Sequence, residues 1–296
     1  MPSVQNQSRI GTMPDTGRTA FVFSGGAVHG AAQVGMLKRL IEAGIKPDVV
    51  VGSSAGAINA AAYADKPSLE GVNFLENVWL DLAENAPVSI SLPQIANAVI
   101  RKRSSFDSGA GMRKLIMSNM DAETFEDLHV ETHICTTSTE TLGPVWWTQG
   151  PVQQIVLASA AIPGVLPSVL LPDGDQHIDG GMVDNVPVGY TSQLEGVTNM
   201  YVLDVTGTPR AQSQGAVPNL LDGLGAASTE IVRMHWAQVP HELSVVHIDL
   251  PHDVDGFTLD FSKVSEFVND GWHACDIALE RSADELLSCS SKVKLN

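Results

Sequence analysis

The stretch Pro-Asp-Val-Val-Val-Gly-Ser-Ser-Ala-Gly-Ala-Ile-Asn-Ala-Ala-Ala-Tyr-Ala, residues 47–64, decides the fold. Its β-branched first part predicts a short buried strand, and its alanine-rich last part predicts a helix. The turn between them reads Gly-x-Ser-x-Gly, a pattern that places a serine on a sharp strand-to-helix turn with its hydroxyl exposed. Gly52 and Gly56 would keep Cβ atoms away from the bent backbone. Ser54 is therefore the candidate nucleophile, and the alternative is a turn of small residues without chemistry.

A second strand and helix precede this stretch. The apolar run 19–23 predicts a buried strand, and residues 31–43 have apolar side chains at helical spacing. Strand, helix and strand together predict a parallel sheet, in which neighbouring strands end at the same edge. The glycine-rich loop Ser-Gly-Gly-Ala-Val-His-Gly, residues 24–30, should then lie beside Ser54 and offer backbone N–H groups to an oxyanion. The loop fits neither Gly-x-Gly-x-x-Gly nor a P-loop, and a plain tight turn is the alternative.

The rest of the chain continues the α/β pattern. We expect one domain over residues 18–296, with three layers (α/β/α) and a mainly parallel central sheet, after a disordered tail at 1–17. Residues 85–111 are irregular and form either a lid over the substrate or ordinary core. The expected helices cover residues 68–84, 112–120, 151–161, 226–239 and 262–287, and the expected strands cover 130–138, 145–148, 200–205 and 243–250. We also expect a long loop over 206–225, a helix N-cap at Ser262 and an interruption of the last helix at Gly271.

Composition excludes several classes of protein. The chain has 296 residues, 44% of them hydrophobic, and 17 basic against 34 acidic residues give a formal charge of −17. Such a charge disfavours nucleic acid as a partner and offers no polybasic patch for an anionic membrane. The three cysteines, Cys135, Cys275 and Cys289, form no close pair, which argues against a disulfide framework or a zinc site. With neither a leader sequence nor an apolar run of membrane-spanning length, we expect a cytoplasmic protein.

A second chemical motif lies at residues 177–187, His-Ile-Asp-Gly-Gly-Met-Val-Asp-Asn-Val-Pro. Asp179 is followed by Gly180 and Gly181, so its carboxylate could project into a cleft with room around it. The alternative is a turn aspartate with local hydrogen bonds. The order of residues also permits a Ser-Asp-His triad, because four histidines follow this motif: His235, His241, His247 and His252.

Taken together, the motifs resemble those of the patatin-like phospholipase family. The resemblance covers nearly everything after the tail and rests on four segments in order: the glycine-rich loop, the turn Gly-Ser-Ser-Ala-Gly, residues 158–167 (Ala-Ser-Ala-Ala-Ile-Pro-Gly-Val-Leu-Pro) and residues 179–187. It implies a Ser-Asp dyad that hydrolyses acyl esters of lipids with no histidine, metal or cofactor. Ser54 would attack the ester carbonyl and Asp179 would act as general base.

The resemblance also implies an oxyanion hole made by the backbone N–H groups of Gly25, Gly26 and Ala27. Ala27 takes the place of a third glycine, and its N–H can serve if its φ is below zero. His29 takes the place of an arginine or lysine, which puts any charge role of that position in doubt.

The implied partner is a lipid or ester substrate, met through transient contact with a membrane or micelle. Without a basic surface, monomeric or micellar substrates are favoured. Two other functions stay open: acyl transfer to an alcohol from the same acyl-enzyme, and a binding or regulatory module without catalysis. Acyl length, head group and oligomeric state do not follow from the sequence.

Overall fold

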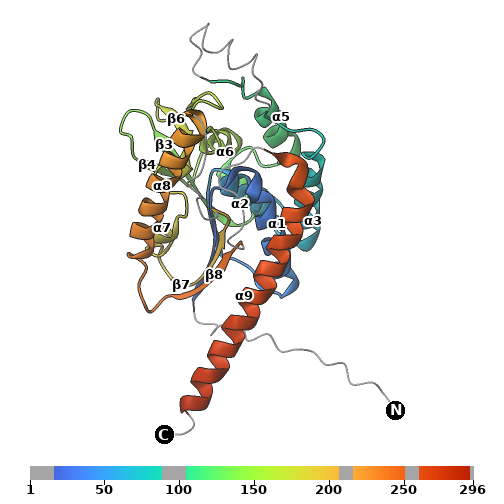
Figure 1. The fold of residues 1–296 in the computed structure, drawn as a ribbon, viewed down its shortest axis with the longest axis vertical. Helices are drawn as coiled ribbons and strands as arrows, with labels where there is room; N and C mark the ends of the chain where they lie inside the picture. The colour runs from blue at the N-terminus through green and yellow to red at the C-terminus, as the bar shows by residue number, and fades with distance from the viewer. Residues whose placement is uncertain (1–16, 89–104, 207–215, 251–259, 294–296) are drawn as a thin grey trace, which may run out of the picture.

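The protein folds around one twisted sheet, which the computed structural model shows with helices on both sides (Figure 1). The structure describes residues 17–88, 105–206, 216–250 and 260–293, and for residues 216–225 and 284–293 it describes the backbone alone. Within these residues the strand order is β5-β6-β3-β2-β1-β7-β8, with β4 paired to β3. The strands are β1 (Arg18–Phe23), β2 (Val49–Ser53), β3 (Glu131–Ser138), β4 (Pro144–Trp147), β5 (Val169–Leu170), β6 (Gln176–Asp179), β7 (Val197–Asp204) and β8 (Ser244–Asp249).

The centre of the sheet is parallel, as the sequence predicts. Strand β1 pairs in parallel with both β2 and β7, and the parallel order continues to β3 and β8 on the two sides. Strands β4, β5 and β6 are antiparallel additions. The register pairs Phe23 with Gly52, so the glycine-rich loop and the Ser54 turn leave the sheet side by side at its carboxyl edge.

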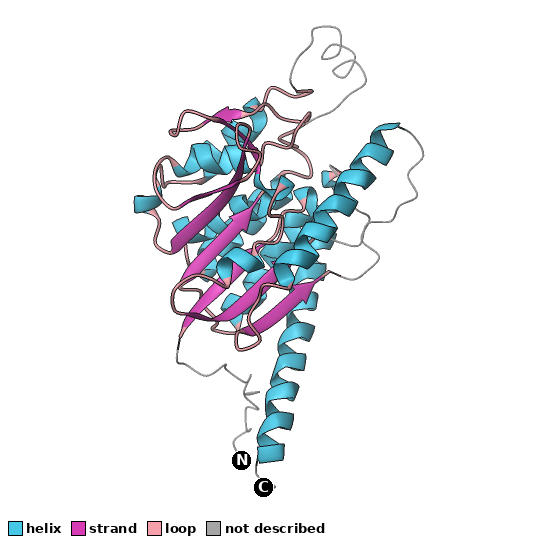
Figure 2. Ribbon diagram, turned by 90° about the vertical axis from the view of Figure 1, so that its left-hand side faces the viewer, coloured by secondary structure: helices cyan, strands magenta, loops and turns pink. Residues whose placement is uncertain are grey.

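Helices cover both faces of the sheet, which confirms the three-layer α/β/α fold (Figure 2). In β1, Phe21 and Phe23 join the large core on one face, while Ala20 and Val22 join smaller clusters on the other. This alternation is that of a strand buried on both sides. The helices of the first face include α1 (Gly30–Glu42), α2 (Ala55–Asp65), α3 (Leu69–Asp81), α5 (Ala110–Asn119), α6 (Val152–Ser159) and α9 (Val264–Val293), and those of the second are α7 (Val188–Thr191) and α8 (Ala216–Trp236).

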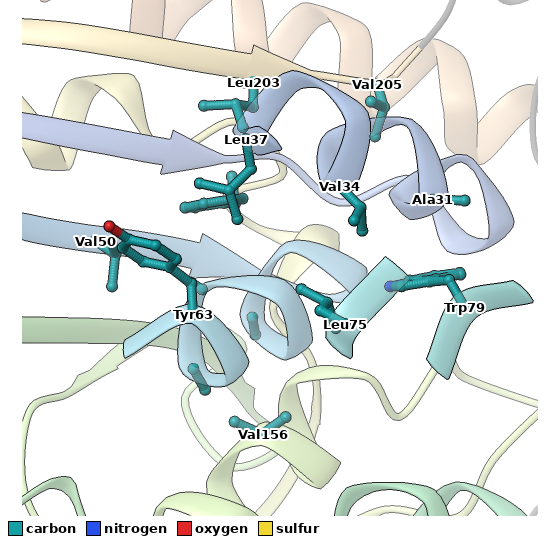
Figure 3. Packing of buried hydrophobic residues seen from close by; sticks show 14 of the residues in the cluster. Ala31, Val34, Leu37, Val50, Tyr63, Leu75, Trp79, Val156, Leu203 and Val205 are labelled. Carbon is teal, nitrogen blue, oxygen red and sulfur yellow. The ribbon is translucent and has the colours of Figure 1, made fainter. Parts of the chain in front are cut away.

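The large core holds the site-bearing helix in place. Figure 3 shows Leu75 and Trp79 of α3 beside Val34 of α1, with Leu37 above Val50 of β2. These side chains are at most 5% exposed. Such burial removes most of each side chain's apolar surface from water and is worth about 2 kcal/mol per large side chain. Helix α2, which follows Ser54, packs into the same core through Ala57, Ala60 and Tyr63, which are buried.

Helix α8 begins earlier than the sequence pattern predicts. Residues 216–225 belong to the helix rather than to the long loop expected over 206–225. Pro218 lies in the first turn, where a missing backbone N–H costs no hydrogen bond, so proline there permits a helix. Residues 207–215 of that expected loop lie outside the described residues.

Helix α9 is continuous through Gly271, so the expected interruption is wrong. A Cβ atom at Gly271 would lie 1.9 Å from the carbonyl oxygen of Ala32, and one at Gly35 would lie 1.9 Å from that of Val268. The two glycines therefore allow α1 and α9 to cross at close range. The N-cap is also two residues earlier than expected, because Asp260 accepts the N–H of Ser262 and caps the short 3-10 helix Phe261–Lys263 that leads into α9.

Two further expectations fall mainly outside the described residues. These are the disordered tail, of which residues 1–16 are not described, and the lid at 85–111, of which residues 89–104 are not described. Within the part of the chain that is described, no helix is both long and apolar enough to cross a membrane.

Candidate active site

Ser54 lies on a strained turn between β2 and α2. Its φ is 55° and its ψ is −125°, in a region that side chains with a Cβ rarely occupy. Glycine is required on both sides of it: a Cβ at Gly52 would lie 2.5 Å from the carbonyl oxygen of Gly56, and one at Gly56 would lie 2.3 Å from that of Phe23. The turn therefore brings the strand and helix so close that the Ser54 side chain projects away from the backbone.

Asp179 reaches Ser54 through the strand order. It is the last residue of β6 and pairs with Thr136 of β3, and β3 is the neighbour of β2. The Ser54 Oγ donates a hydrogen bond of 2.7 Å to Asp179 Oδ2. The sheet thus joins two side chains that are 125 residues apart in the sequence.

The two glycines after Asp179 fix the orientation of its carboxylate. The Gly181 N–H donates a 2.7 Å hydrogen bond to Asp179 Oδ1, so the two carboxylate oxygens have different partners. A Cβ at Gly180 would lie 2.3 Å from the carbonyl oxygen of Cys135, which places this turn directly against β3. The local hydrogen bond that the sequence offered as an alternative is present, together with the contact to Ser54.

The environment of Asp179 makes it a base suited to neutral pH. Burial removes water from the carboxylate and raises its pKa to about 7, although the hydrogen bonds from Ser54 and Gly181 act in the opposite direction. A group with a pKa near the working pH is the most effective general base. Its position against a serine hydroxyl matches the geometry of an activated nucleophile.

The glycine-rich loop lies next to Ser54 but offers fewer donors than the sequence suggests. The Gly25 N–H donates to the carbonyl oxygen of Asn185 at 2.8 Å, so it is already bonded, which corrects the expectation for this residue. A Cβ at Gly25 would lie 3.0 Å from Ser54 Cβ. Gly26 and Ala27 remain the candidate oxyanion donors.

Ala27 has a φ of 48°, which contradicts the expected negative value. The left-handed conformation keeps the backbone N–H, so Ala27 stays a candidate donor. This left-handed conformation favours glycine, the residue that the resemblance places at this position. The alanine therefore holds the loop in a strained conformation, and strain of this kind is common at functional sites.

Several residues that hold the site have no assigned role in the sequence. Ser159, at the end of α6, accepts the Ser54 N–H at 3.0 Å. Gln33 of α1 donates to the carbonyl oxygens of Ser24 (2.7 Å) and Leu203 (3.0 Å), which ties the loop to β7. For Ser159, the sequence feature that could have pointed to a role is its place in the motif 158–167. For Gln33, it is the presence of a polar residue in an otherwise apolar helix face.

Two of the four histidines of the alternative triad contact other carboxylates, and a third, His241, is exposed to solvent. His235 Nδ1 lies 2.8 Å from Asp184 Oδ1, and His247 Nε2 lies 3.0 Å from Asp204 Oδ2. His252 lies outside the described residues. The described geometry therefore favours a dyad over a triad.

An apolar cavity opens from Ser54. It encloses about 970 Å³ including its open mouth, and helices α2, α3 and α5 provide most of its walls. Ala27, Ala160 and Phe261 also line it. A cavity with an almost wholly apolar lining and a nucleophile at one end suits an apolar substrate. Among the described residues, no group of three or more His, Cys, Asp and Glu side chains could hold a metal ion.

This fold, with a serine and an aspartate at the carboxyl edge of the sheet, is that of a patatin-like hydrolase. The family model described as "Patatin-like phospholipase" matches residues 21–191, which contain both Ser54 and Asp179. The chain therefore belongs to the patatin-like phospholipase family, and the resemblance seen in the sequence is confirmed. The members of this family are serine hydrolases of lipid esters.

Curated relatives are much longer than this chain. It is 28% identical over 199 residues to patatin-like phospholipase domain-containing protein 7 of Rattus norvegicus, covering 67% of this chain and 14% of that protein. It is 28% identical over 192 residues to lysophospholipase nte1 of Aspergillus terreus, covering 62% of this chain and 12% of that protein. Among solved structures, VipD from Legionella pneumophila matches with a TM-score of 0.46 and 14% identity, covering 90% of this chain and 67% of that one.

Proposed function

We propose that the protein is a lipid acyl hydrolase that works through a Ser54-Asp179 dyad and an acyl-enzyme. The observation that supports this most directly is the 2.7 Å hydrogen bond from Ser54 Oγ to the buried carboxylate of Asp179, at the end of an apolar cavity. The family model and the names of the relatives agree with an ester substrate.

In the first half of the reaction, the Ser54 Oγ attacks the ester carbonyl while its proton passes to Asp179. The new Oγ–C bond gives a tetrahedral intermediate, and the N–H groups of Gly26 and Ala27 bind its negatively charged oxygen. Collapse of the intermediate breaks the bond to the alcohol, which takes the proton back from Asp179. One oxyanion donor of this kind is worth about 3 kcal/mol of the barrier.

In the second half, a water molecule attacks the acyl-enzyme and gives its proton to Asp179. The Oγ–C bond breaks, Ser54 recovers a proton, and the free acid leaves. An alcohol in place of the water would give acyl transfer from the same intermediate. Nothing in the described residues favours one acceptor over the other, so we propose hydrolysis on the basis of the family.

The test is a hydrolysis panel of diacyl phospholipids, lysophospholipids and simple esters, with Ser54→Ala as the matched control. We expect wild type to release free acid from at least one ester class and Ser54→Ala to lose at least about 100-fold in kcat/KM. Added alcohols will reveal any transacylated product. Folded wild type that hydrolyses none of the esters and is not labelled at Ser54 by a fluorophosphonate would instead indicate a binding module.

A further inference from the structure

One face of helix α2 connects Ser54 with Lys66. Ala55, Ile58, Ala62 and Lys66 follow one another at helical spacing, and all four line the apolar cavity. Because a helix rises 1.5 Å per residue, the twelve residues from Ser54 to Lys66 span about 18 Å. The cavity is therefore a channel that starts at the nucleophile and runs along the helix.

Helix α3 forms a second wall and runs in the opposite direction. Ser68, two residues after Lys66, caps α3, so the start of α3 lies at the far end of the channel. There the Lys66 Nζ lies 5.0 Å from the centroid of the Phe74 ring. At the near end, a Cβ on Gly30 would lie 2.9 Å from Ala55 and 3.0 Å from Trp79. Helix α5 supplies the third wall, with Met112, Leu115, Ile116 and Asn119.

A group of paired charges lies at the far end of the channel, at the protein surface. The Lys66 ammonium lies 3.2 Å from a carboxylate oxygen of Asp65 and 3.2 Å from one of Asp121, and it donates to the carbonyl oxygen of Asn119 at 3.5 Å. An alkyl chain that extended past this group would displace these polar contacts and place its own carbons in water, so a chain longer than the channel gains no further burial. The channel is thus apolar along its length and polar at its end.

We propose that this channel is a ruler for the acyl chain, and that Ile58, Ala62 and Phe74 set the chain-length preference. The inference rests on the proposed hydrolysis at Ser54. The ester carbonyl lies at Ser54, the alkyl chain follows α2, and the terminal methyl group lies against Phe74 and the stem of Lys66. With bonds of about 1.5 Å and angles near 111°, an extended alkyl chain advances about 1.25 Å per carbon, so about 18 Å holds about 14 carbons.

Two substitutions that block the channel at different depths test the ruler. Ile58 lies about 6 Å and Ala62 about 12 Å along the helix from Ser54, which corresponds to about 5 and about 10 carbons. We expect Ile58→Trp and Ala62→Phe to reduce kcat/KM at least about tenfold for esters longer than these two limits, and to change shorter esters by less than about twofold. The substrates are p-nitrophenyl esters of saturated acids from about 4 to about 18 carbons.

A third substitution opens the far end and has a matched control on the same helix. Phe74 and Leu69 are 42% and 40% exposed, and of the two only Phe74 lines the channel. Relative to wild type, Phe74→Ala should raise kcat/KM several-fold for esters with acyl chains longer than about 14 carbons. Leu69→Ala should leave the whole chain-length profile unchanged. Thermal melting of each variant shows that it is folded.

The outcomes separate the ruler from the proposed function. If wild type hydrolyses the esters but Ile58→Trp and Ala62→Phe do not lower the chain length above which kcat/KM falls, the ruler is wrong and the proposed hydrolysis stands. If wild type hydrolyses neither these esters nor the phospholipids and lysophospholipids, the proposed function fails, and displacement of a fluorescent fatty acid from Ser54→Ala decides the ruler alone. Affinity should then rise with each added carbon up to about 14 and level off beyond it. Affinity that keeps rising, or that does not depend on chain length, would overturn the ruler.

Discussion

Asp179 is buried beside Ser54, and desolvation raises the pKa of its carboxyl group to about 7. This value is close to that of imidazole in water, about 6.5. A carboxylate in this environment can therefore accept the proton of a serine hydroxyl near neutral pH, as a histidine does in a triad. The contact is direct, since Ser54 Oγ donates to Asp179 Oδ2.

The pH dependence of the reaction should follow this carboxyl group. Because Asp179 must be ionised to take the proton, kcat/KM for a neutral ester should rise about tenfold per pH unit below a pKa of about 7 and level off above it. A pH–rate profile from pH 5 to about 9 measures this. A profile that is already flat at pH 5 would show that the essential base has an ordinary carboxylate pKa.

The same pKa makes ionised Asp179 a cost to stability. Its pKa rises from 3.8 to about 7 on folding, so the stability that it contributes is complete below pH 3.8 and is lost as the pH rises through about 7. The loss is at most about 4 kcal/mol. Asp179→Asn has no charge here, so its free energy of unfolding in urea should exceed that of wild type by more at pH 8 than at pH 5. An equal difference at both pH values would contradict the raised pKa.

Ala27 offers a test of strain in the glycine-rich loop. Its φ of 48° is unfavourable for a residue with a Cβ, so Ala27→Gly should raise the free energy of unfolding by about 1 kcal/mol. The backbone N–H is kept, and ester hydrolysis should continue. Urea unfolding measures the gain. If Ala27→Gly instead lowers the free energy of unfolding, as an alanine-to-glycine change in an ordinary helix does, this position is not strained.

At the scale of elements, the crossing of α1 and α9 depends on two glycines. A Cβ at Gly271 would lie 1.9 Å from the carbonyl oxygen of Ala32, a backbone atom that cannot move alone. Gly271→Ala should therefore destabilise the protein by about 2 kcal/mol or more, although alanine in an open helix would stabilise it by about 1 kcal/mol.

The sign of this change is the informative result, and Gly143→Ala is its control. At Gly143 the nearest atom to an added Cβ is 3.6 Å away, an ordinary contact. We expect this control to change stability by less than about 0.5 kcal/mol in the same urea titration. Stabilisation by Gly271→Ala would show that the helices do not cross as closely as described.

At the scale of the whole molecule, the sheet places distant segments at one edge. The local patterns of the sequence predict β1, the glycine-rich loop, α1, β2 and the Ser54 turn, because each depends on residues close together in the chain. The parallel pairing and both members of the dyad follow from those patterns and from the family resemblance.

What the sequence does not predict depends on contacts between distant residues. Ser159 bonds a backbone group 105 residues away, and Asn185 takes the N–H of Gly25. Polar residues of this kind have no periodicity to mark them. The conformation of Ala27 and the early start of α8 were also missed, because tertiary contacts and the place of a proline within a first turn override local propensity.

The central claim is that one carboxylate, without a histidine, activates Ser54. The direct test compares kcat/KM of Asp179→Asn with that of His235→Gln and His247→Gln on one ester, using melting curves to show that each variant is folded. The dyad predicts a loss of at least about 100-fold for Asp179→Asn and less than about fivefold for each histidine variant. A folded histidine variant as inactive as Asp179→Asn, or an Asp179→Asn enzyme with nearly full activity, would contradict it.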